Sequence, residues 1–238
     1  MGEYGTPNID IEEGWLTVQH NDRSQKFLYP RQASSLYHTT KIMDTDLLWF
    51  AVRTWGLRVT DLMQGPVYGL HTPEMSLGQD LGTNFNYDEI FGTVINRFVV
   101  QAVCGYPITV YGGGNQKRGF INLIDSLACI EKASLHAPKN GQLNIFNQIT
   151  ETFSVMELAK LVSSTAEKFD IDTTIKLVAN PRIEAEDHYY NPKYEKLESL
   201  GFIPSRLTDK IGLPGIMKHV LQYRTNIDRD IIFNSVKW

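Results

Sequence analysis

The sequence predicts an α/β protein, and three observations support this fold class. Strand-like and helix-like segments alternate along most of the 238 residues. Gly56 follows a helical segment and precedes a short apolar run, which is the usual punctuation between a helix and a strand. The composition, with 42% hydrophobic and 21% charged residues, is ordinary for a globular protein with a sizeable core.

The first half of the chain is expected to hold a hairpin, two helices and a strand. Residues 15–29 alternate around the polar pair Asn21–Asp22, which predicts a surface hairpin. A helix is expected over residues 33–55, followed by a strand over 57–62 and a turn-rich stretch over 64–86. A second helix is expected over residues 87–104. The apolar side of the first helix is assigned to Leu47, Leu48, Ala51 and Trp55.

The second half continues the alternation. Strands are expected over residues 107–111, 120–124, 143–146 and 175–178, and helices over 125–136, 154–168, 192–200 and 211–224. Ser154 and Glu157 have the spacing of a helix capping box. The glycine run Gly112–Gly114 has neither the GxGxxG spacing nor the P-loop lysine, so it predicts a turn between strands.

Composition excludes several classes of function. The formal net charge is −4 and no dense Lys/Arg run occurs, which argues against nucleic-acid binding. No apolar stretch approaches the ~20 residues that span a bilayer. Cys104 and Cys129 form no metal or disulfide pattern and are expected to be free, buried thiols. The opening segment has no signal-peptide or transit-peptide pattern, and two free thiols suit a reducing compartment, so we expect a soluble intracellular protein. No metal site is expected.

The segment Tyr37–Lys41 is a YxxxK motif on the first predicted helix. Residues four positions apart lie on the same face of a helix, one turn from each other. A lysine ammonium near a tyrosine favours the ionised phenolate, which can then accept a hydroxyl proton. Because YxxxK also arises by chance, its context decides whether it is functional.

The context resembles the extended short-chain dehydrogenases. Residues 64–69 (QGPVYG) resemble the loop that closes over nicotinamide and sugar in this family, and residues 118–125 (RGFINLID) resemble its arginine–aromatic–aspartate segment. Three longer strings are similar to those of UDP-sulfoquinovose synthases within that family. They are MGEYGTPNIDI (residues 1–11), NQITETFSV (147–155) and NPRIEAEDHYYN (180–191). The resemblance covers the C-terminal two thirds of such an enzyme and omits the first Rossmann strands.

The resemblance implies roles for individual residues. Tyr37 would be the catalytic base and Lys41 its partner, which also holds the nicotinamide ribose, while Val67 would line the cofactor. Glu3 and His38 would be candidate proton-transfer groups for the sulfite chemistry. The threonine that precedes the MGEYG string in the family would fall before Met1. Substrate binding would involve Gln64, Thr93, Asn96, Ile108, Thr109, Val110, Arg118 and Arg182, with the two arginines at the diphosphate.

The implied reaction forms UDP-sulfoquinovose from UDP-glucose and sulfite. Hydride leaves C4 to bound NAD, water is lost across C5–C6 of the 4-keto sugar, sulfite adds at C6, and the hydride returns. Residues 1–70 would be the remnant of the NAD-binding Rossmann domain. Residues 71–238 would mainly form the smaller nucleotide-sugar-binding domain, with some segments returning to the Rossmann sheet. The resemblance also allows a homodimer and either the cytoplasm or a plastid stroma.

Other interpretations of the same residues stay open. A UDP-sugar 4-epimerase or 4,6-dehydratase uses the same YxxxK, and a truncated chain would bind nucleotide sugar without turnover. Asn96 would also be ordinary as an exposed polar residue of a helix. Arg118 would also be ordinary as a surface charge beside a turn. Arg182 would be ordinary in an ion pair with Glu184 or Glu186, and His38 in a structural role.

Overall fold

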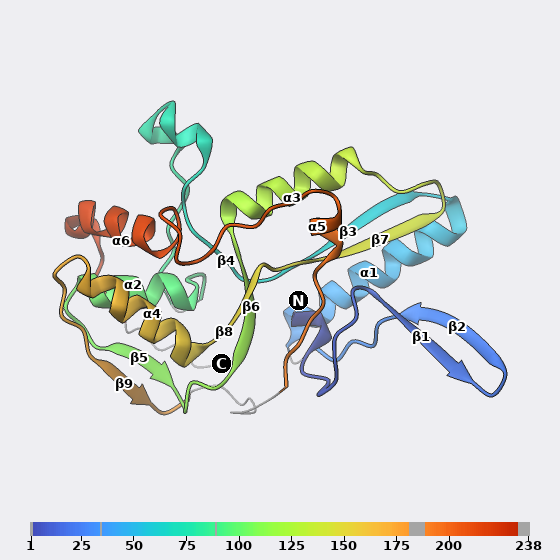
Figure 1. Cartoon of the computed structure of the whole chain (residues 1–238), viewed down its shortest axis with the longest axis horizontal. Helices are drawn as coiled ribbons and strands as arrows, with labels where there is room; N and C mark the ends of the chain where they lie inside the picture. Colours follow the sequence, from blue (N-terminus) through green and yellow to red (C-terminus); the bar gives the residue numbers. More distant parts are fainter. Residues whose placement is uncertain (1, 34, 89, 181–188, 233–238) are drawn as a thin grey trace. The chain divides into compact units, whose positions relative to one another are not determined.

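The computed structural model describes residues 2–33, 35–88, 90–180 and 189–232 (Figure 1). The chain divides into two compact units, each assembled from three separate stretches of sequence. Unit 1 comprises Met1–Gly65, Asp125–Thr150 and Tyr189–Pro204, and unit 2 comprises Pro66–Ile124, Glu151–His188 and Ser205–Trp238. Strands and helices alternate, and three of the strand pairs are parallel, which confirms the α/β class.

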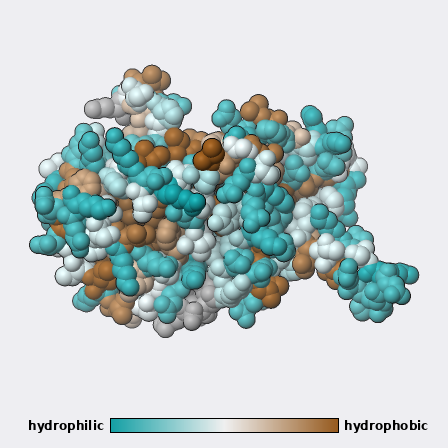
Figure 2. Space-filling model, viewed as in Figure 1, coloured by the Kyte–Doolittle hydropathy of each residue, from teal (hydrophilic) through white to brown (hydrophobic). Residues whose placement is uncertain are grey.

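Unit 1 begins with the 3-10 helix η1 (Gly2–Tyr4) and the hairpin of β1 (Trp15–His20) and β2 (Arg23–Leu28). The hairpin is antiparallel with His20 paired to Arg23, so Asn21 and Asp22 form its two-residue turn, as predicted. Asn21 adopts a left-handed φ of 53°, which this residue type tolerates well. The hairpin is exposed over most of its length, and its tip is hydrophilic in Figure 2.

The long helix of unit 1 is α1 (Leu36–Trp55), which begins after the N-cap Ser35 and ends at Gly56 in the left-handed conformation. The predicted glycine cap is therefore confirmed, and the helix starts three residues later than residue 33. The predicted apolar side was right only in part, because Leu48 and Ala51 are half-buried but the other two predicted residues are exposed. Thr45 and Val52 are buried, whereas Leu47 and Trp55 are 64% and 67% exposed. The buried side is selected by the strands beneath the helix, which the local pattern does not contain.

Those strands are β3 (Arg58–Gln64) and β7 (Gln142–Gln148), which pair in parallel along their whole length. Their register places Gln64 opposite Gln148 at the carboxyl ends of both strands. Unit 1 also holds most of α3 (Leu123–Leu135) and the short α5 (Lys196–Ser199), where a longer helix over 192–200 had been expected. Its apolar cluster is small, with the buried members Tyr4, Ile11, Tyr29, Val52, Met63, Leu143, Ile145 and Ile149.

Unit 2 contains a three-stranded sheet and a separate parallel pair. The sheet has the order β4 (Val67–Tyr68), β6 (Lys117–Asn122) and β8 (Glu151–Ser154), with β4–β6 parallel and β6–β8 antiparallel. The pair is β5 (Ile108–Tyr111) with β9 (Ile175–Val178), and the bounds of β9 are those predicted. The turn at Gly112–Gly114 follows β5, as expected.

Three helices of unit 2 enclose its apolar core: α2 (Val94–Val103), α4 (Val155–Glu167) and α6 (Leu213–Gln222). The capping box of α4 is present, with the Ser154 and Glu157 side chains exchanging hydrogen bonds with each other's backbone. The prediction that α2 begins at residue 87 was wrong, because Thr93 caps the helix and a turn at residues 90–91 precedes it. Four 3-10 turns complete the described elements: η2 (Pro73–Ser76), η3 (Gln79–Leu81), η4 (Arg224–Asn226) and η5 (Asp230–Ile232).

Two further expectations concern the cysteines and membrane spans. Both thiols are free; Cys129 is buried and Cys104 is half-buried. Burial raises the pKa of Cys129 to about 11, which keeps this thiol protonated near neutral pH. Within the described part of the chain, every helix is too short or too polar to cross a bilayer.

Candidate functional site

The first turns of α1 carry Tyr37, His38 and Lys41. Tyr37 is 67% exposed, so its hydroxyl is open to a ligand. The Lys41 ammonium lies 5.8 Å from the centre of the Tyr37 ring, and the His38 ring lies edge-on to the same ring at 5.3 Å. The helix therefore places a phenol, an imidazole and an ammonium together at one end, as the one-turn spacing of YxxxK requires.

The side chains around this motif orient two of its members. The Lys41 ammonium donates to Asp44 Oδ2 at 2.9 Å, and this carboxylate raises the pKa of Lys41. The helix therefore holds Lys41 as a cation beside the phenol. His38 Nδ1 lies 2.9 Å from the hydroxyl of Ser35, the N-cap residue, so the cap that starts the helix also fixes the imidazole.

The η1 segment lies directly against this end of α1. A side chain at Gly2 would place its Cβ 2.2 Å from His38 Nε2, so the imidazole could keep this position only against glycine. Glu3 follows, and Arg31 Nη1 lies 3.3 Å from Glu3 Oε2 with the two side chains 4% and 10% exposed. Unit 1 therefore brings Glu3, His38, Tyr37 and Lys41 to one place. Arg31 is a neighbour that the sequence gave no reason to single out.

Opposing effects act on the Glu3 carboxyl. Burial raises its pKa above the usual value, the Arg31 guanidinium lowers it, and the more distant Asp61 and Asp44 carboxylates raise it. Burial prevails over the guanidinium, so Glu3 takes up a proton at higher pH than an exposed glutamate does. A carboxyl of this kind suits proton transfer near neutral pH.

Behind Glu3, a polar network ties three parts of unit 1 together. The Tyr4 hydroxyl donates to Asn147 Oδ1 at 3.1 Å, and Asn147 Nδ2 donates to the carbonyl of Lys193 at 2.7 Å. The buried Glu13 accepts from the backbone N–H groups of Asn147 at 2.8 Å and Lys196 at 3.2 Å. This network fixes the segment that carries Glu3 to β7 and to residues 193–196.

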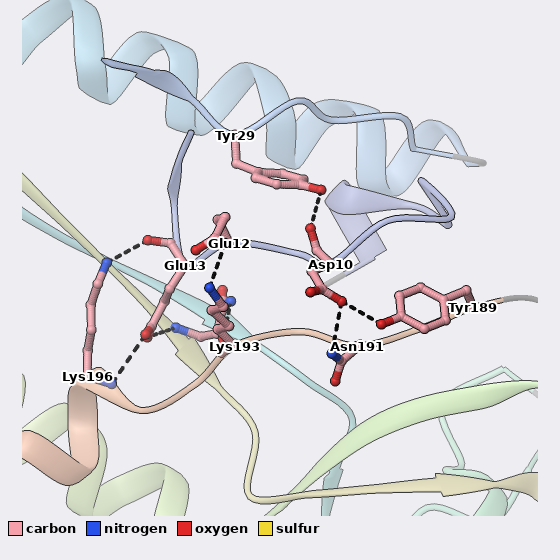
Figure 3. Close-up of polar contacts among 9 residues, drawn as sticks. Asp10, Glu12, Glu13, Tyr29, Tyr189, Asn191, Lys193 and Lys196 are labelled. Carbon is pink, nitrogen blue, oxygen red and sulfur yellow. Dashed lines mark hydrogen bonds and ion pairs between the residues drawn. The ribbon is translucent and has the colours of Figure 1, made fainter. Parts of the chain in front are cut away.

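Figure 3 shows the outer part of the network, where Asp10, Glu12 and Glu13 contact residues 189–196. Asp10 accepts from the Tyr189 hydroxyl at 2.5 Å and from Asn191 Nδ2 at 2.9 Å, and Lys193 donates to Glu12 at 2.6 Å. Asp10, Tyr189 and Asn191 belong to the strings that carry the family resemblance, but sequence reasoning assigned none of these contact residues a role. Their contacts join positions that are more than a hundred residues apart, which local patterns do not reveal.

Gln64 ends β3 and is engaged within unit 1. Its Nε2 donates to Ser126 Oγ at 2.6 Å and to Gln148 Oε1 at 3.2 Å. Gln148 in turn donates to the carbonyl of Ser126 at 3.1 Å. The predicted sugar-binding side chain is thus held at the carboxyl ends of two parallel strands, where ligands of open α/β sheets bind.

In unit 2, Thr93 and Asn96 lie in the first turn of α2, not at the middle of a helix as expected. The Thr93 hydroxyl caps the helix by accepting from the Asn96 N–H at 3.3 Å. Asn96 Nδ2 donates to the carbonyl of Asn86 at 2.9 Å, while its buried Oδ1 has no hydrogen-bond partner among the described residues. Asn96 is also buried, so its alternative interpretation as an exposed helix residue was wrong.

The remaining candidates of unit 2 lie on strands. Ile108 and Val110 are buried in β5, and both the N–H and the hydroxyl of Thr109 bond to the buried side chain of Gln101, at 3.0 and 2.8 Å. Arg118 is half-buried on β6 and donates to the carbonyl of Lys117 at 2.8 Å. Val67 is half-buried on β4. Arg182 lies outside the described residues.

Comparison with known proteins adds a decisive observation. No protein-family model matches the sequence. The chain is 47% identical over all 238 residues to the chloroplastic UDP-sulfoquinovose synthase of Spinacia oleracea, of which it covers 49%. It is 43% identical over 242 aligned positions to the UDP-sulfoquinovose synthase of Sulfolobus acidocaldarius, of which it covers 61%.

The whole chain is homologous to UDP-sulfoquinovose synthases. It spans about half of the spinach relative and 61% of the Sulfolobus acidocaldarius one. Similarity to a UDP-glucuronic acid decarboxylase of Arabidopsis thaliana is weaker, at 33% identity over 55% of this chain and 28% of that protein. The homology to UDP-sulfoquinovose synthases is therefore both stronger and more complete.

Solved structures establish the fold of the described part. A UDP-glucuronic acid 4-epimerase of Bacillus cereus superposes with a TM-score of 0.65 over 93% of this chain and 59% of that one, at 17% identity. The UDP-glucose 4-epimerase of Thermus thermophilus superposes with a TM-score of 0.61 over 92% of this chain and 63% of that one, at 18% identity. The chain thus has the fold of part of an extended short-chain dehydrogenase.

Proposed function

We propose that this chain supplies the sugar-modifying side chains of an NAD-dependent enzyme that forms UDP-sulfoquinovose from UDP-glucose and sulfite. The observation that carries the proposal is the 47% and 43% identity to UDP-sulfoquinovose synthases along the entire chain. The cluster of Glu3, His38, Tyr37 and Lys41 in unit 1 supports it, because it contains both a phenol–lysine pair and further proton-transfer groups.

Tyr37 and Lys41 fit the nicotinamide end of NAD. The exposed phenol and the neighbouring ammonium are the groups that would hold the nicotinamide ribose and remove the proton of the sugar 4-hydroxyl. Bound NAD would accept the hydride from C4 and return it at the end of the cycle. Val67 would line this position. The sequence contains no GxGxxG turn, so the pyrophosphate end would rest on groups outside these 238 residues.

The steps at C5 and C6 fall to Glu3 and His38. The Glu3 carboxylate would remove the C5 proton, whose bonding electrons form the C5=C6 double bond as the C6 hydroxyl leaves. Protonated His38 would give that hydroxyl its proton, so it departs as water. Sulfite then adds through sulfur at C6, and C5 recovers its proton from Glu3. The sum is UDP-glucose, sulfite and one proton giving UDP-sulfoquinovose and water.

Substrate binding would be shared among the remaining candidates. Gln64 would contact the sugar, and Ile108, Thr109 and Val110 would flank the uracil through their backbone groups. Thr93, Asn96, Arg118 and Arg182 would hold the diphosphate. The orphaned Asn96 Oδ1 can only accept a hydrogen bond, so it would meet a hydroxyl or N–H of the ligand beside the diphosphate. The cytoplasm or a plastid stroma stays the expected compartment.

A homodimer is proposed on the exposed side of α1. Large apolar side chains recur there at helical spacing, and Leu36, Met43, Leu47 and Phe50 are between 49% and 82% exposed. Helix stripes of this kind normally pack against another helix. Sedimentation of the chain and of a Leu47→Glu/Phe50→Glu variant tests the proposal: a dimer that becomes a monomer supports it, and a monomeric parent contradicts it.

The activity is tested in a chimaera in which residues 1–238 replace the matching segment of the spinach enzyme. Incubation with UDP-glucose and NAD, with and without sulfite, followed by mass spectrometry, should show a sulfonated sugar nucleotide only when sulfite is present. Tyr37→Phe should reduce its formation by about 10²–10⁴-fold, the usual loss on removal of a general base. UDP-galactose or a 4-keto-6-deoxy sugar, formed with or without sulfite, would instead indicate an epimerase or a dehydratase.

A further inference from the structure

We propose that Arg31 is a positioning residue for Glu3. Its guanidinium holds the Glu3 carboxylate in place and keeps it ionised, so that Glu3 can act as the base at C5. The inference rests on the proposed function for the identity of the proton that Glu3 removes. The placement and charge of Glu3, however, are properties of this chain that are measurable without turnover.

Burial is the first observation. The Arg31 side chain is 4% exposed, and Nε, Nη1 and Nη2 have no hydrogen-bond partner among the described residues. A guanidinium stays charged when it is buried, because it does not lose its proton in proteins. A buried charge without a partner is strongly unfavourable. Its contact with Glu3 Oε2 is the ion pair that the structure gives it within the described chain. A buried charge that faces a carboxylate in a candidate site is a candidate for a functional role.

The geometry of the pair is the second observation. Glu3 Oε2 faces the guanidinium at 3.3 Å without a hydrogen bond, while a tenth of the Glu3 side chain stays exposed. Arg31 therefore stabilises the Glu3 carboxylate electrostatically. The lone pairs of the carboxylate oxygens are not engaged in the two strong hydrogen bonds of a bidentate contact. A carboxylate held in this way keeps the capacity to accept a proton.

The backbone around Arg31 is the third observation. The Gln32 N–H donates to the Glu3 carbonyl at 3.1 Å. Gly5 has a φ of +63°, and a Cβ at this position would lie 2.1 Å from the Gln32 carbonyl oxygen. Together with the contact of Gly2 on His38, these approaches hold η1 between the segment at residues 31–32 and the first turn of α1. Arg31 thus comes from the same segment that fixes the backbone of Glu3.

The charges that face Glu3 come from several elements. Arg31 favours the ionised carboxylate, whereas Asp61 on β3 and Asp44 on α1 disfavour it, and burial disfavours it most. His38 lies against Gly2, next to Glu3, on the remaining side. Among the described groups that act on Glu3, Arg31 is the cation closest to its carboxylate. Its removal should therefore favour the protonated carboxylic acid, which cannot act as a base.

The direct test is a nuclear magnetic resonance titration of the Glu3 carboxyl carbon in this chain labelled with ¹³C-glutamate. The signal is assigned with Glu3→Gln. Compared with the parent, Arg31→Met should move the titration midpoint to higher pH by about one unit or more, as loss of an opposite charge at this distance does. Arg31→Lys, which keeps the charge, should leave the midpoint close to that of the parent. Arg23→Met, at an exposed position of the hairpin, should leave the midpoint unchanged.

A midpoint that does not move in Arg31→Met while the chain stays folded would overturn the proposal. If Arg31→Met unfolds the chain, the folded Arg31→Lys variant decides. A midpoint equal to that of the parent supports the role of the charge. A midpoint raised by about one unit or more, although the charge is kept, contradicts that role. In the chimaera, the acid side of the pH–rate profile should shift in the same direction. A shifted titration without sulfonated product would refute the proposed function and leave the charge relation between Arg31 and Glu3 standing.

Discussion

The two units of this chain bury different kinds of side chain. The core of unit 2 is apolar, with Phe98, Ile95 and Leu158 fully enclosed among α2, α4 and α6. Unit 1 has a smaller apolar cluster. The buried acids of the described chain all belong to unit 1; they are Glu3, Glu13 and Asp125. Buried charge lowers stability unless it is paired, so its concentration in one unit indicates where the chemistry of the molecule is placed.

The comparison also separates two sources of stability. Unit 2 gains its stability from the removal of apolar surface from water. Unit 1 depends more on hydrogen bonds between buried polar groups that are distant in sequence. An example is Glu13, which accepts from the N–H groups of Asn147 and Lys196. Loss of one partner in such a network leaves the other buried and unsatisfied. Three predictions test this difference, in order of decreasing effect.

The largest loss of stability is expected from a truncation in unit 2. Phe98 is fully buried in α2, so Phe98→Ala should lower the free energy of unfolding by about 3–5 kcal/mol. Urea unfolding followed by circular dichroism measures this loss. Phe91→Ala, at a site 75% exposed, is the matched control and should have little effect. Equal losses for both variants would show that the core of unit 2 is not the source of its stability.

A neighbouring pair of glutamates tests unit 1. Glu13 is buried and bonded to two backbone N–H groups, so Glu13→Ala should lower stability by about 2–4 kcal/mol. Glu12 forms an exposed ion pair with Lys193, so Glu12→Ala should cost about 0–1 kcal/mol. Tryptophan fluorescence is a suitable probe because Trp15, Trp49 and Trp55 all lie in unit 1. Similar values for the two variants would remove the distinction between the units.

The smallest effect concerns Asp10 and pH. The Tyr189 hydroxyl, and then Asn191, lower the pKa of Asp10 by bonding to its ionised form. Such a group stabilises the fold above its unfolded pKa, about 3.9, and the stabilisation is lost as pH falls through the lower folded value. The parent should therefore be slightly more stable than Asp10→Asn at pH 7, and the difference should vanish on acidification. A difference that is constant down to pH 2 would contradict this assignment.

Much of the fold was predictable because its signals are local. The hairpin at Asn21–Asp22, the glycine cap of α1, the capping box of α4 and the strand β9 each depend on residues close in sequence. The buried side of α1 was mispredicted in part because the strands β3 and β7 decide which side is covered. The start of α2 was mispredicted because the cap at Thr93 overrides the apolar residues before it.

The candidate site was predictable only in part. Tyr37 and Lys41 follow from helical spacing, and the structure places them within one turn. Arg31 and the Tyr4–Asn147–Lys193 network were missed, because their contacts join segments that are distant in sequence and follow no periodic pattern. A buried arginine is recognised only when its neighbours are known. Unit 2 shows the same limit at Gln101, whose amide satisfies both polar groups of Thr109.

The central claim is that unit 1 carries the sugar chemistry, with Tyr37 acting at C4 and Glu3 acting at C5. The most direct measurement follows exchange of the C5 hydrogen of UDP-glucose in deuterated water, in the spinach chimaera and its Glu3→Gln variant, without sulfite. We expect deuterium at C5 for the parent. For Glu3→Gln we expect at least about 10²-fold slower exchange, with reduction of the nicotinamide retained. Unchanged C5 exchange in Glu3→Gln, with nicotinamide reduction also unchanged, would contradict the central claim.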